Sequence, residues 1–384
     1  MKHTTKKFFS FVMVMVMLVA LCAGFANAAD EESFKIGGTG PLTGGAAIYG
    51  NAAKNGAQIA VDEINEAMGY DFFELRYEDD AHDAEKAVNA YNALKDWGMQ
   101  ISLGSVTSAP CSATAAETYN DRIFALTPSA SAPAVIEGKD NMYQMCFLDY
   151  PTQGGASAQY ISEMSLGEKI AIIWKNDEDY STGLRNSFVD RAAELGLDIV
   201  SETTFTDETN DFTVQLTEAQ NAGADLVFLP MYYQPASLIF SQANAMGYAP
   251  KWFGVDGMDG ILTMEGFDPT MAEGVMLLTP FNADSSDSAT VAFVQKYQEL
   301  YGETPNQFAA DAYDCVYAYK QALEAAGATA DMSASELCDL MISQFTSMTF
   351  NGLTGTGMTW DTTGAVSKGA HGCVIKDGAY VGLD

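Results

Sequence analysis

Polar or aromatic side chains follow four strand-like apolar runs of this chain, each at the point where its run ends. They are Ser108 after QISLGS, Ser129 and Ser131 after RIFALTP, Tyr232 after DLVFLP, and Asp256 at the end of KWFGVD. Hydroxyls and backbone N–H groups at a helix N-terminus bind a carboxylate without a basic residue. A carboxylate such as Asp256 can bind an ammonium group. The set can therefore hold a small zwitterion, although helix capping explains Ser108 and Ser131 equally well when each is taken alone.

The glycine-rich stretch KIGGTGPLTGG (35–45) raises the alternative of a nucleotide site. The dinucleotide fingerprint requires G-x-G-x-x-G, and Thr43 stands at its third glycine. The phosphate loop G-x-x-x-x-G-K-[ST] also fails, because alanines follow Gly45 where lysine is needed. We therefore interpret the stretch as a first strand and a tight glycine turn at the rim of a different kind of site, where it positions Tyr49.

Enzyme and metal chemistry would need residues that the sequence lacks. His82 and His371 are the histidines beyond the N-terminal segment, and no G-x-S-x-G or H-E-x-x-H pattern occurs. The acidic run EDDAHD (78–83) does not match a calcium loop, and we interpret it as a cap for a helix that begins near Ala84. We interpret Asp259 as a helix cap outside the ligand shell. We expect no catalytic residue, no bound metal and no cofactor.

Alternating strand and helix signals must position these side chains. Strand-like runs alternate with amphipathic segments such as 52–68, where apolar residues recur at helical spacing. This alternation predicts an α/β fold with doubly wound parallel sheets, which bind ligands beyond the carboxyl ends of their strands. Two long helices are expected near 286–302 and 307–326, and short strands from 350 onward. The predicted strands are 34–38, 72–78, 100–105, 122–128, 169–175, 198–205, 225–230 and 251–256.

Length and the doubling of this pattern predict two lobes. A chain of 384 residues is too long for one ordinary core. One βα series precedes Tyr150-Pro151, and a second follows it as far as Pro280. We expect each lobe to combine two separate segments of the chain. The first lobe would comprise 29–148 and 281–356, and the second lobe 149–280 and 357–384.

The N-terminal segment indicates an exported protein. Basic residues precede an apolar run (8–23), and the small-x-small pattern at 26–28 predicts a cleavage site. We therefore interpret 1–28 as a signal peptide and expect a periplasmic or other extracytoplasmic location. A lipid anchor on Cys22 is less favoured, because Leu21 stands before it where a small residue is usual.

Composition narrows the class of partner. The net charge of −32 argues against binding to nucleic acid or to anionic membranes. With 48% hydrophobic and 18% charged residues, the chain is globular rather than disordered. An odd number of cysteines would remain after the signal peptide, so at least one thiol would be unpaired. Cys338–Cys373 is the first pair to check among Cys111, Cys146, Cys315, Cys338 and Cys373.

Several sequence blocks, in order, resemble the type I periplasmic amino-acid-binding proteins, especially the leucine/isoleucine/valine-binding family of ABC importers. The blocks are KIGGTGPLTGGAAIYGNAAKNGAQIAVDEIN, GSVTS, LTPSASAP, WKNDEDYSTGLRNSF and FGVDGMDG. The resemblance covers essentially the whole chain beyond the signal peptide. It implies two α/β lobes joined by three hinge crossings, the Venus-flytrap architecture, with ligand capture in the cleft between them.

The resemblance also implies a role for each site residue. Ser108 and Ser131 would supply hydroxyl contacts to the α-carboxylate and the amino group, and Ser129 would act mainly through its backbone carbonyl. Asp256 stands where the family often has a glutamate that faces the ammonium, so its shorter side chain alters the contact distance. The pocket for the ligand side chain would be lined by Tyr49, Tyr180 and Tyr232.

These features predict a substrate-binding protein that captures an amino acid, branched-chain or otherwise aliphatic, and delivers it to the permease subunits of an ABC importer. We expect a monomer that performs no chemistry and binds no nucleic acid. Binding of amides, short peptides or aromatic acids is the alternative for the ligand. A ligand-sensing receptor module is less favoured, because no transmembrane or signalling segment precedes Asp384. An exported hydrolase is also less favoured, because nucleophile–base motifs are missing.

Overall fold

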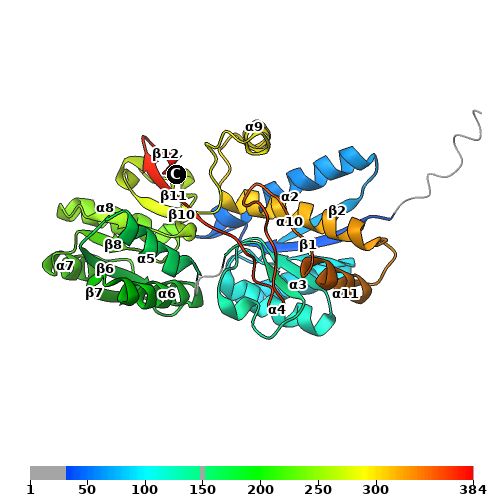
Figure 1. Ribbon diagram of the computed structural model, residues 1–384, viewed down its shortest axis with the longest axis horizontal. Helices are drawn as coiled ribbons and strands as arrows, with labels where there is room; N and C mark the ends of the chain where they lie inside the picture. Colours follow the sequence, from blue (N-terminus) through cyan, green and yellow to red (C-terminus); the bar gives the residue numbers. More distant parts are fainter. Residues whose placement is uncertain (1–31, 148–151, 384) are drawn as a thin grey trace, which may run out of the picture.

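Two β-sheets, one in each of two lobes, form the frame of the computed structural model, which describes residues 32–147 and 152–383 (Figure 1). The first sheet has parallel strands in the order β2-β1-β3-β4-β5. It confirms every strand predicted before 148 and adds β5, which is too short to show in the sequence pattern. The strands are β1 (Phe34–Gly40), β2 (Phe73–Asp79), β3 (Ile101–Leu103), β4 (Phe124–Thr127) and β5 (Met142–Gln144).

Helices pack on both faces of this first sheet. The helices α2, α10 and α11 share the main core with one face, and α3 and α4 cover the other. A Cβ at Gly56 would lie 1.9 Å from the carbonyl oxygen of Ala309, so glycine allows α2 and α10 to pack closely. The bounds are α2 (Ala47–Met68), α3 (Ala84–Trp97), α4 (Ser108–Asp121), α10 (Gln307–Ala326) and α11 (Ala334–Phe345), of which α11 was not predicted.

The second sheet is mixed rather than wholly parallel. Its order is β12-β11-β10-β9-β8-β6-β7, and β10 pairs with β11 in antiparallel fashion, as β11 does with β12. The last two strands reach the sheet from the other lobe and form a hairpin at its edge. The strands are β6 (Lys169–Lys175), β7 (Asp198–Phe205), β8 (Leu226–Phe228), β9 (Lys251–Phe253), β10 (Met276–Thr279), β11 (His371–Lys376) and β12 (Ala379–Gly382).

Helices also cover both faces of the second sheet. The helices α5 and α6 form a core with one face, and α7 and α8 pack on the other. The helix α9, at the top of Figure 1, belongs to the main core instead, where the Phe293 ring lies 4.9 Å from the Tyr313 ring of α10. The bounds are α5 (Gly154–Glu163), α6 (Asp179–Leu195), α7 (Thr213–Asn221), α8 (Tyr233–Met246) and α9 (Ser288–Tyr301), with short 3₁₀ turns η2 (Pro133–Val135), η4 (Asp256–Met258), η5 (Ile261–Thr263) and η6 (Pro269–Ala272).

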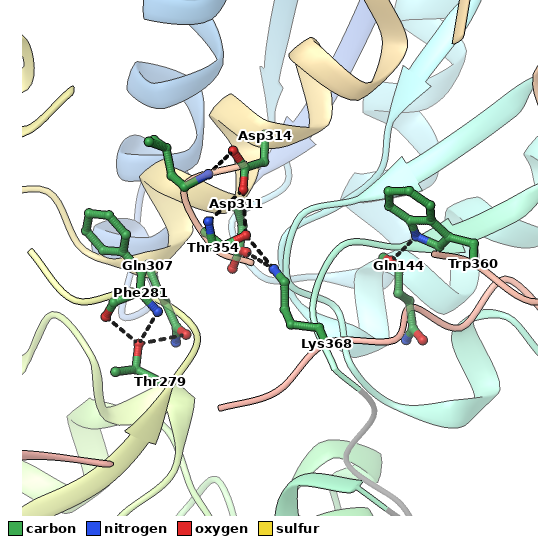
Figure 2. A network of polar contacts seen from close by, with 10 residues as sticks. Gln144, Thr279, Phe281, Gln307, Asp311, Asp314, Thr354, Trp360 and Lys368 are labelled. Carbon is green, nitrogen blue, oxygen red and sulfur yellow. Dashed lines mark hydrogen bonds and ion pairs between the residues drawn. The ribbon is translucent and has the colours of Figure 1, made fainter. Parts of the chain in front are cut away.

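The stretch 350–368 differs from the prediction. It forms only the isolated bridges Phe350–Met358 and Trp360–Val366 among the described residues, and the predicted C-terminal strands begin later, at β11. Trp360 Nε1 donates to the carbonyl of Gln144 at 2.8 Å (Figure 2). This contact places Trp360 against the first lobe, although the predicted boundary assigns it to the second.

A buried ion pair fastens the same stretch to the first lobe. Lys368 Nζ lies 2.7 Å from Asp311 Oδ1 on α10 and donates to Thr354 Oγ1 at 2.6 Å (Figure 2). Asp314, one turn further along α10, accepts the backbone N–H groups of Leu353 and Thr354. We therefore propose that the third crossing between the lobes lies just after Lys368 rather than at 356.

Candidate functional site

The site residues lie at strand ends and helix starts on both sides of the junction between the lobes. Ser108 is the first residue of α4, and the loop after β4 carries Ser129 and Ser131. From the second lobe, Tyr180 lies in the first turn of α6, Tyr232 directly precedes α8, and Asp256 opens η4 after β9. Parallel strands place their carboxyl ends at one edge of a sheet, which gathers these side chains.

Asp256 is a buried carboxylate that no cation of the described residues neutralises. Asp256 is 4% exposed. It forms no ion pair with any described residue. Asp256 Oδ1 accepts the Tyr180 hydroxyl at 2.5 Å and the Gly257 N–H at 2.8 Å. Burial raises the pKa of Asp256 to about 6, although the hydrogen bonds from Tyr180 and the Gly257 N–H counteract part of that effect. Such a group is suited to an incoming cation.

The three predicted tyrosines meet in one aromatic cluster. The rings of Tyr180 and Tyr232 stack with centroids 4.5 Å apart, and Tyr49 lies 5.5 Å from Tyr232. The Tyr49 hydroxyl donates to the carbonyl of Gly257 and accepts the N–H of Tyr233 at 3.2 Å. Tyr49 comes from α2 of the first lobe, so its side chain joins the two lobes. The structure thus brings Tyr49, Tyr180, Tyr232 and Asp256 together.

The three predicted serines form a second group on the first lobe. Ser108 Oγ accepts the N–H of Ala132 at 3.2 Å, and Ser129 Oγ donates to the carbonyl of Val106 at 2.6 Å. Ser131 Oγ is buried and has no hydrogen-bond partner among the described residues. A hydroxyl in that state is available to a ligand.

A chain of side-chain contacts links the start of α4 to Asp256. Thr107, the N-cap residue of α4, lies 2.9 Å from His82 Nδ1, and the His82 ring packs edge-on against Tyr232 at 5.6 Å. Tyr232 in turn stacks on Tyr180, whose hydroxyl binds Asp256. The two groups of predicted residues therefore line one continuous junction between the lobes.

Sequence reasoning missed the contribution of α10. Gln307 Nε2 donates to the backbone carbonyl of Asp256 at 2.7 Å, and the Phe308 ring lies 4.4 Å from that of Tyr49. Both residues open a predicted helix, which is the signal that could have marked them. Gln153 was missed as well; both polar atoms of its buried side chain make no hydrogen bond with described residues.

Asp259 differs from its interpretation. It does cap a helix, because Asp259 Oδ2 accepts the N–H of Gln307 at the start of α10. That helix, α10, however, belongs to the other lobe. The distance from Gln307 N to Asp259 Oδ2 is 2.8 Å, and Asp259 is buried. Burial raises its pKa to about 7. Asp259 thus takes part in the junction between the lobes.

The acidic run, the glycine-rich turn and the cysteines were also interpreted from the sequence. Asp83 accepts the N–H of Lys86 at 2.9 Å and so caps α3, as predicted for the acidic run. Asp79 accepts the N–H of Leu42 at 2.8 Å, which anchors the glycine-rich turn before α2. Cys338 is a buried free thiol, so the Cys338–Cys373 pair was a wrong candidate.

No helix in 32–147 or 152–383 has the length and apolarity to cross a membrane. In the same two ranges, no cluster of three or more histidine, cysteine, aspartate or glutamate side chains could hold a metal ion.

Comparison with known proteins gives consistent matches along the chain. A family model described as "Periplasmic binding protein" matches residues 33–379. A protein of Brucella melitensis called "Leu/Ile/Val-binding protein homolog 3" is 27% identical over 82% of this chain and 85% of its own length. These matches span both lobes.

Solved structures show the same fold. A leucine-binding protein of Thermotoga maritima has a TM-score of 0.81 and 27% identity, covering 91% of this chain and 97% of its own. A branched-chain amino acid transporter substrate-binding protein of Streptococcus pneumoniae, in complex with isoleucine, also has a TM-score of 0.81 and 27% identity, covering 91% and 98%.

Proposed function

Since the chain belongs to the periplasmic binding protein family, we propose that it captures an α-amino acid between its lobes and delivers it to an ABC permease. The family is one of solute-binding proteins rather than enzymes. A branched-chain or other aliphatic amino acid is the proposed ligand class. The isoleucine held by the Streptococcus pneumoniae protein supports that class.

The observation that carries the proposal is the unpaired carboxylate of Asp256 at the junction of the lobes. A buried carboxylate is costly to ionise unless a cation and hydrogen-bond donors compensate it. Tyr180 and Gly257 supply donors, but no described residue supplies the cation. The α-ammonium of an amino acid would complete this site.

The first lobe offers the groups for the rest of the ligand. The buried Ser131 hydroxyl and the backbone N–H groups that open α4 at Ser108 are suited to the α-carboxylate. Ser129 would contribute its backbone carbonyl, because its hydroxyl is already bonded to Val106. The aromatic faces of the tyrosine cluster would enclose an aliphatic side chain, and Phe308 extends that surface.

Ligand binding would favour a closed arrangement of the lobes. Tyr49 and Gln307 from the first lobe bond to Gly257 and Asp256 of the second, so these contacts require the lobes to be together. A ligand shifts such an equilibrium only when it contacts the closed form better than the open form. A zwitterion held at one end by each lobe meets that condition.

The location and the partners follow from the same family membership. We propose an extracytoplasmic monomer that meets the permease subunits. The predicted signal peptide (1–28) and the alternative lipid anchor at Cys22 lie outside the described residues.

Calorimetry with matched ligands tests the proposal. Leucine should bind, whereas 4-methyl-2-oxopentanoate, which has the same side chain and carboxylate but no ammonium, should bind at least a hundredfold more weakly. Solution scattering should show a smaller radius of gyration with leucine than without it. Equal affinity for the two compounds, or no binding of any amino acid, would contradict the proposal.

A further inference from the structure

A cavity of about 290 Å³ opens beside the tyrosine cluster. Both lobes contribute to its walls, which include Ala46 and His82 from the first and Lys175, Glu178 and Tyr232 from the second. An aliphatic ligand would not need the charged part of this lining. The cavity is therefore a place where the ligand class can be sharpened.

Glu178, in the wall of this cavity, has a carboxylate oxygen that lacks a hydrogen-bond donor in the described part of the chain. It is 9% exposed, and its Oε1 lies 3.5 Å from Lys175 Nζ and 3.7 Å from His82 Nε2. Its Oε2 is buried and has no hydrogen-bond partner among the described residues. An ionised carboxylate only accepts hydrogen bonds, and a buried one is stabilised by each donor that it gains.

Lys175, the nearest cation, does not supply the missing donor to Glu178 Oε2. Lys175 Nζ lies closer to Asp207, at 2.6 Å, than to Glu178. Burial tends to lower the pKa of Lys175, but Glu178 and Asp207 together raise it, so the lysine stays charged. Three carboxylates, Asp177, Glu178 and Asp207, thus share one ammonium here, which favours a donor or a cation and disfavours an anionic ligand side chain.

The cavity adjoins both ends of the proposed amino-acid site. Tyr232, which lines it, stacks on Tyr180, whose hydroxyl binds Asp256. His82, on the opposite wall, bonds to Thr107 next to Ser108. A ligand side chain that extends from the proposed site past Tyr232 or His82 would enter the cavity where Glu178 lies.

We propose that the protein binds amino acids whose side chain ends in a nitrogen–hydrogen donor, a cationic amine or a neutral amide, with Glu178 as the acceptor. This inference rests on the proposed amino-acid function and goes beyond the aliphatic class. Glu178 would act as a specificity-determining residue that leaves the α-amino and α-carboxylate contacts unchanged.

Calorimetry with ornithine, glutamine, leucine and glutamate tests this inference. Ornithine or glutamine should bind at least as tightly as leucine, and the tighter of the two identifies the cation or the amide. Glutamate should bind most weakly. Glu178→Gln should weaken the favoured donor by about tenfold, equivalent to about 1.4 kcal/mol, and change leucine binding less than twofold. Glu208→Gln, an exposed change of the same charge, should leave all four affinities unaltered.

The outcomes separate the two proposals. Leucine binding by the parent protein, with no binding of ornithine or glutamine, would overturn the role of Glu178 and leave the amino-acid function intact. Equal weakening of leucine and the donor in Glu178→Gln would also overturn it, because that pattern indicates a general effect on the fold or the cleft. If no amino acid binds, both proposals fail.

Discussion

Two buried aspartates of this molecule differ in whether the protein supplies a cation. Asp311 on α10 is paired with Lys368, and the pair is almost completely excluded from solvent (Figure 2). Asp256 at the start of η4 is equally buried and has hydrogen-bond donors but no cation among the described residues. The fold supplies the first carboxylate with a cation, whereas the described residues supply none to the second.

This difference separates a structural site from a binding site. The Lys368–Asp311 pair joins the stretch after Trp360 to α10, which supports the proposed crossing out of the first lobe just after Lys368. The carboxylate of Asp256 holds Tyr180 of α6 and the adjacent Gly257, which both belong to the second lobe. Substitutions at the two sites should therefore affect different measurements.

Lys368→Met should have the largest effect, on stability. Removal of one partner of a buried ion pair leaves an uncompensated charge and costs about 3–5 kcal/mol. We expect the free energy of unfolding, measured in guanidinium chloride at pH 7.5, to fall by that amount. The double variant Lys368→Met/Asp311→Asn should recover at least half of the loss. A loss below about 1 kcal/mol for the single variant would place the pair among weak surface contacts.

Asp256→Asn should affect ligand affinity and spare the fold. Loss of a buried charge-assisted contact is worth about 2.7 kcal/mol, which corresponds to roughly a hundredfold rise in Kd for leucine. The unfolding free energy of the ligand-free variant should not fall, because the change removes a desolvated carboxylate. Asp268→Asn, at an exposed cap of η6, is the matched control and should bind like the parent. A similar loss of leucine affinity in Asp256→Asn and Asp268→Asn would contradict a specific role of Asp256 in binding, and with it the contrast to Asp311.

The pH dependence of binding should distinguish the two aspartates further. Because burial raises the pKa of Asp256 to about 6, the ligand-free carboxyl holds a proton below that pH and cannot pair with an ammonium. Affinity for leucine should therefore fall about tenfold for each pH unit below 6, by proton linkage. Asp256→Asn should lose this dependence. A parent Kd that is constant between pH 5 and 7 would refute the assignment.

The Asp256 carboxyl should give the stability of the ligand-free protein the opposite pH dependence. Its pKa is higher in the folded protein than in the unfolded chain, so its contribution to stability is present at low pH and is lost as the pH rises through about 6. Asp80 and Asp314, whose pKa values burial also raises to about 6, add contributions of the same sign. The difference between the parent and Asp256→Asn isolates the share of Asp256.

Tyr49→Phe should have the smallest effect. The substitution keeps the aromatic contacts but removes the hydroxyl that bonds to Gly257 and Tyr233 across the junction. One neutral hydrogen bond is worth about 1 kcal/mol, so Kd for leucine should rise about fivefold. Tyr91→Phe removes a hydroxyl bonded to Asp121, far from the junction on α3, and should leave Kd unchanged. Equal changes in both variants would argue against a closing contact by Tyr49.

The sequence alone determined the strands and the residues that follow them. Apolar runs such as KIAIIWK and DLVFLP form inner strands of the second sheet, and their pattern depends only on local spacing. Tyr232 and Asp256 follow such strands directly and could be proposed as site residues without knowledge of any long-range contact, whereas Tyr180 was proposed from the family resemblance. The helix α11 was overlooked, although Ser333 and Glu336 form a capping box that marks its start.

Only the tertiary structure decided which of these residues are in contact and which of the aspartates has a cation beside it. Gln307 and Asp256 are 51 positions apart, and Lys368 and Asp311 are 57 apart; no local periodicity records such pairs. The role of Asp259 was misjudged for the same reason, because the helix that it caps begins on the other lobe. Charge compensation depends on distance through a low-dielectric interior, so whether an aspartate has a cation of its own is settled by packing and not by its neighbours in the sequence.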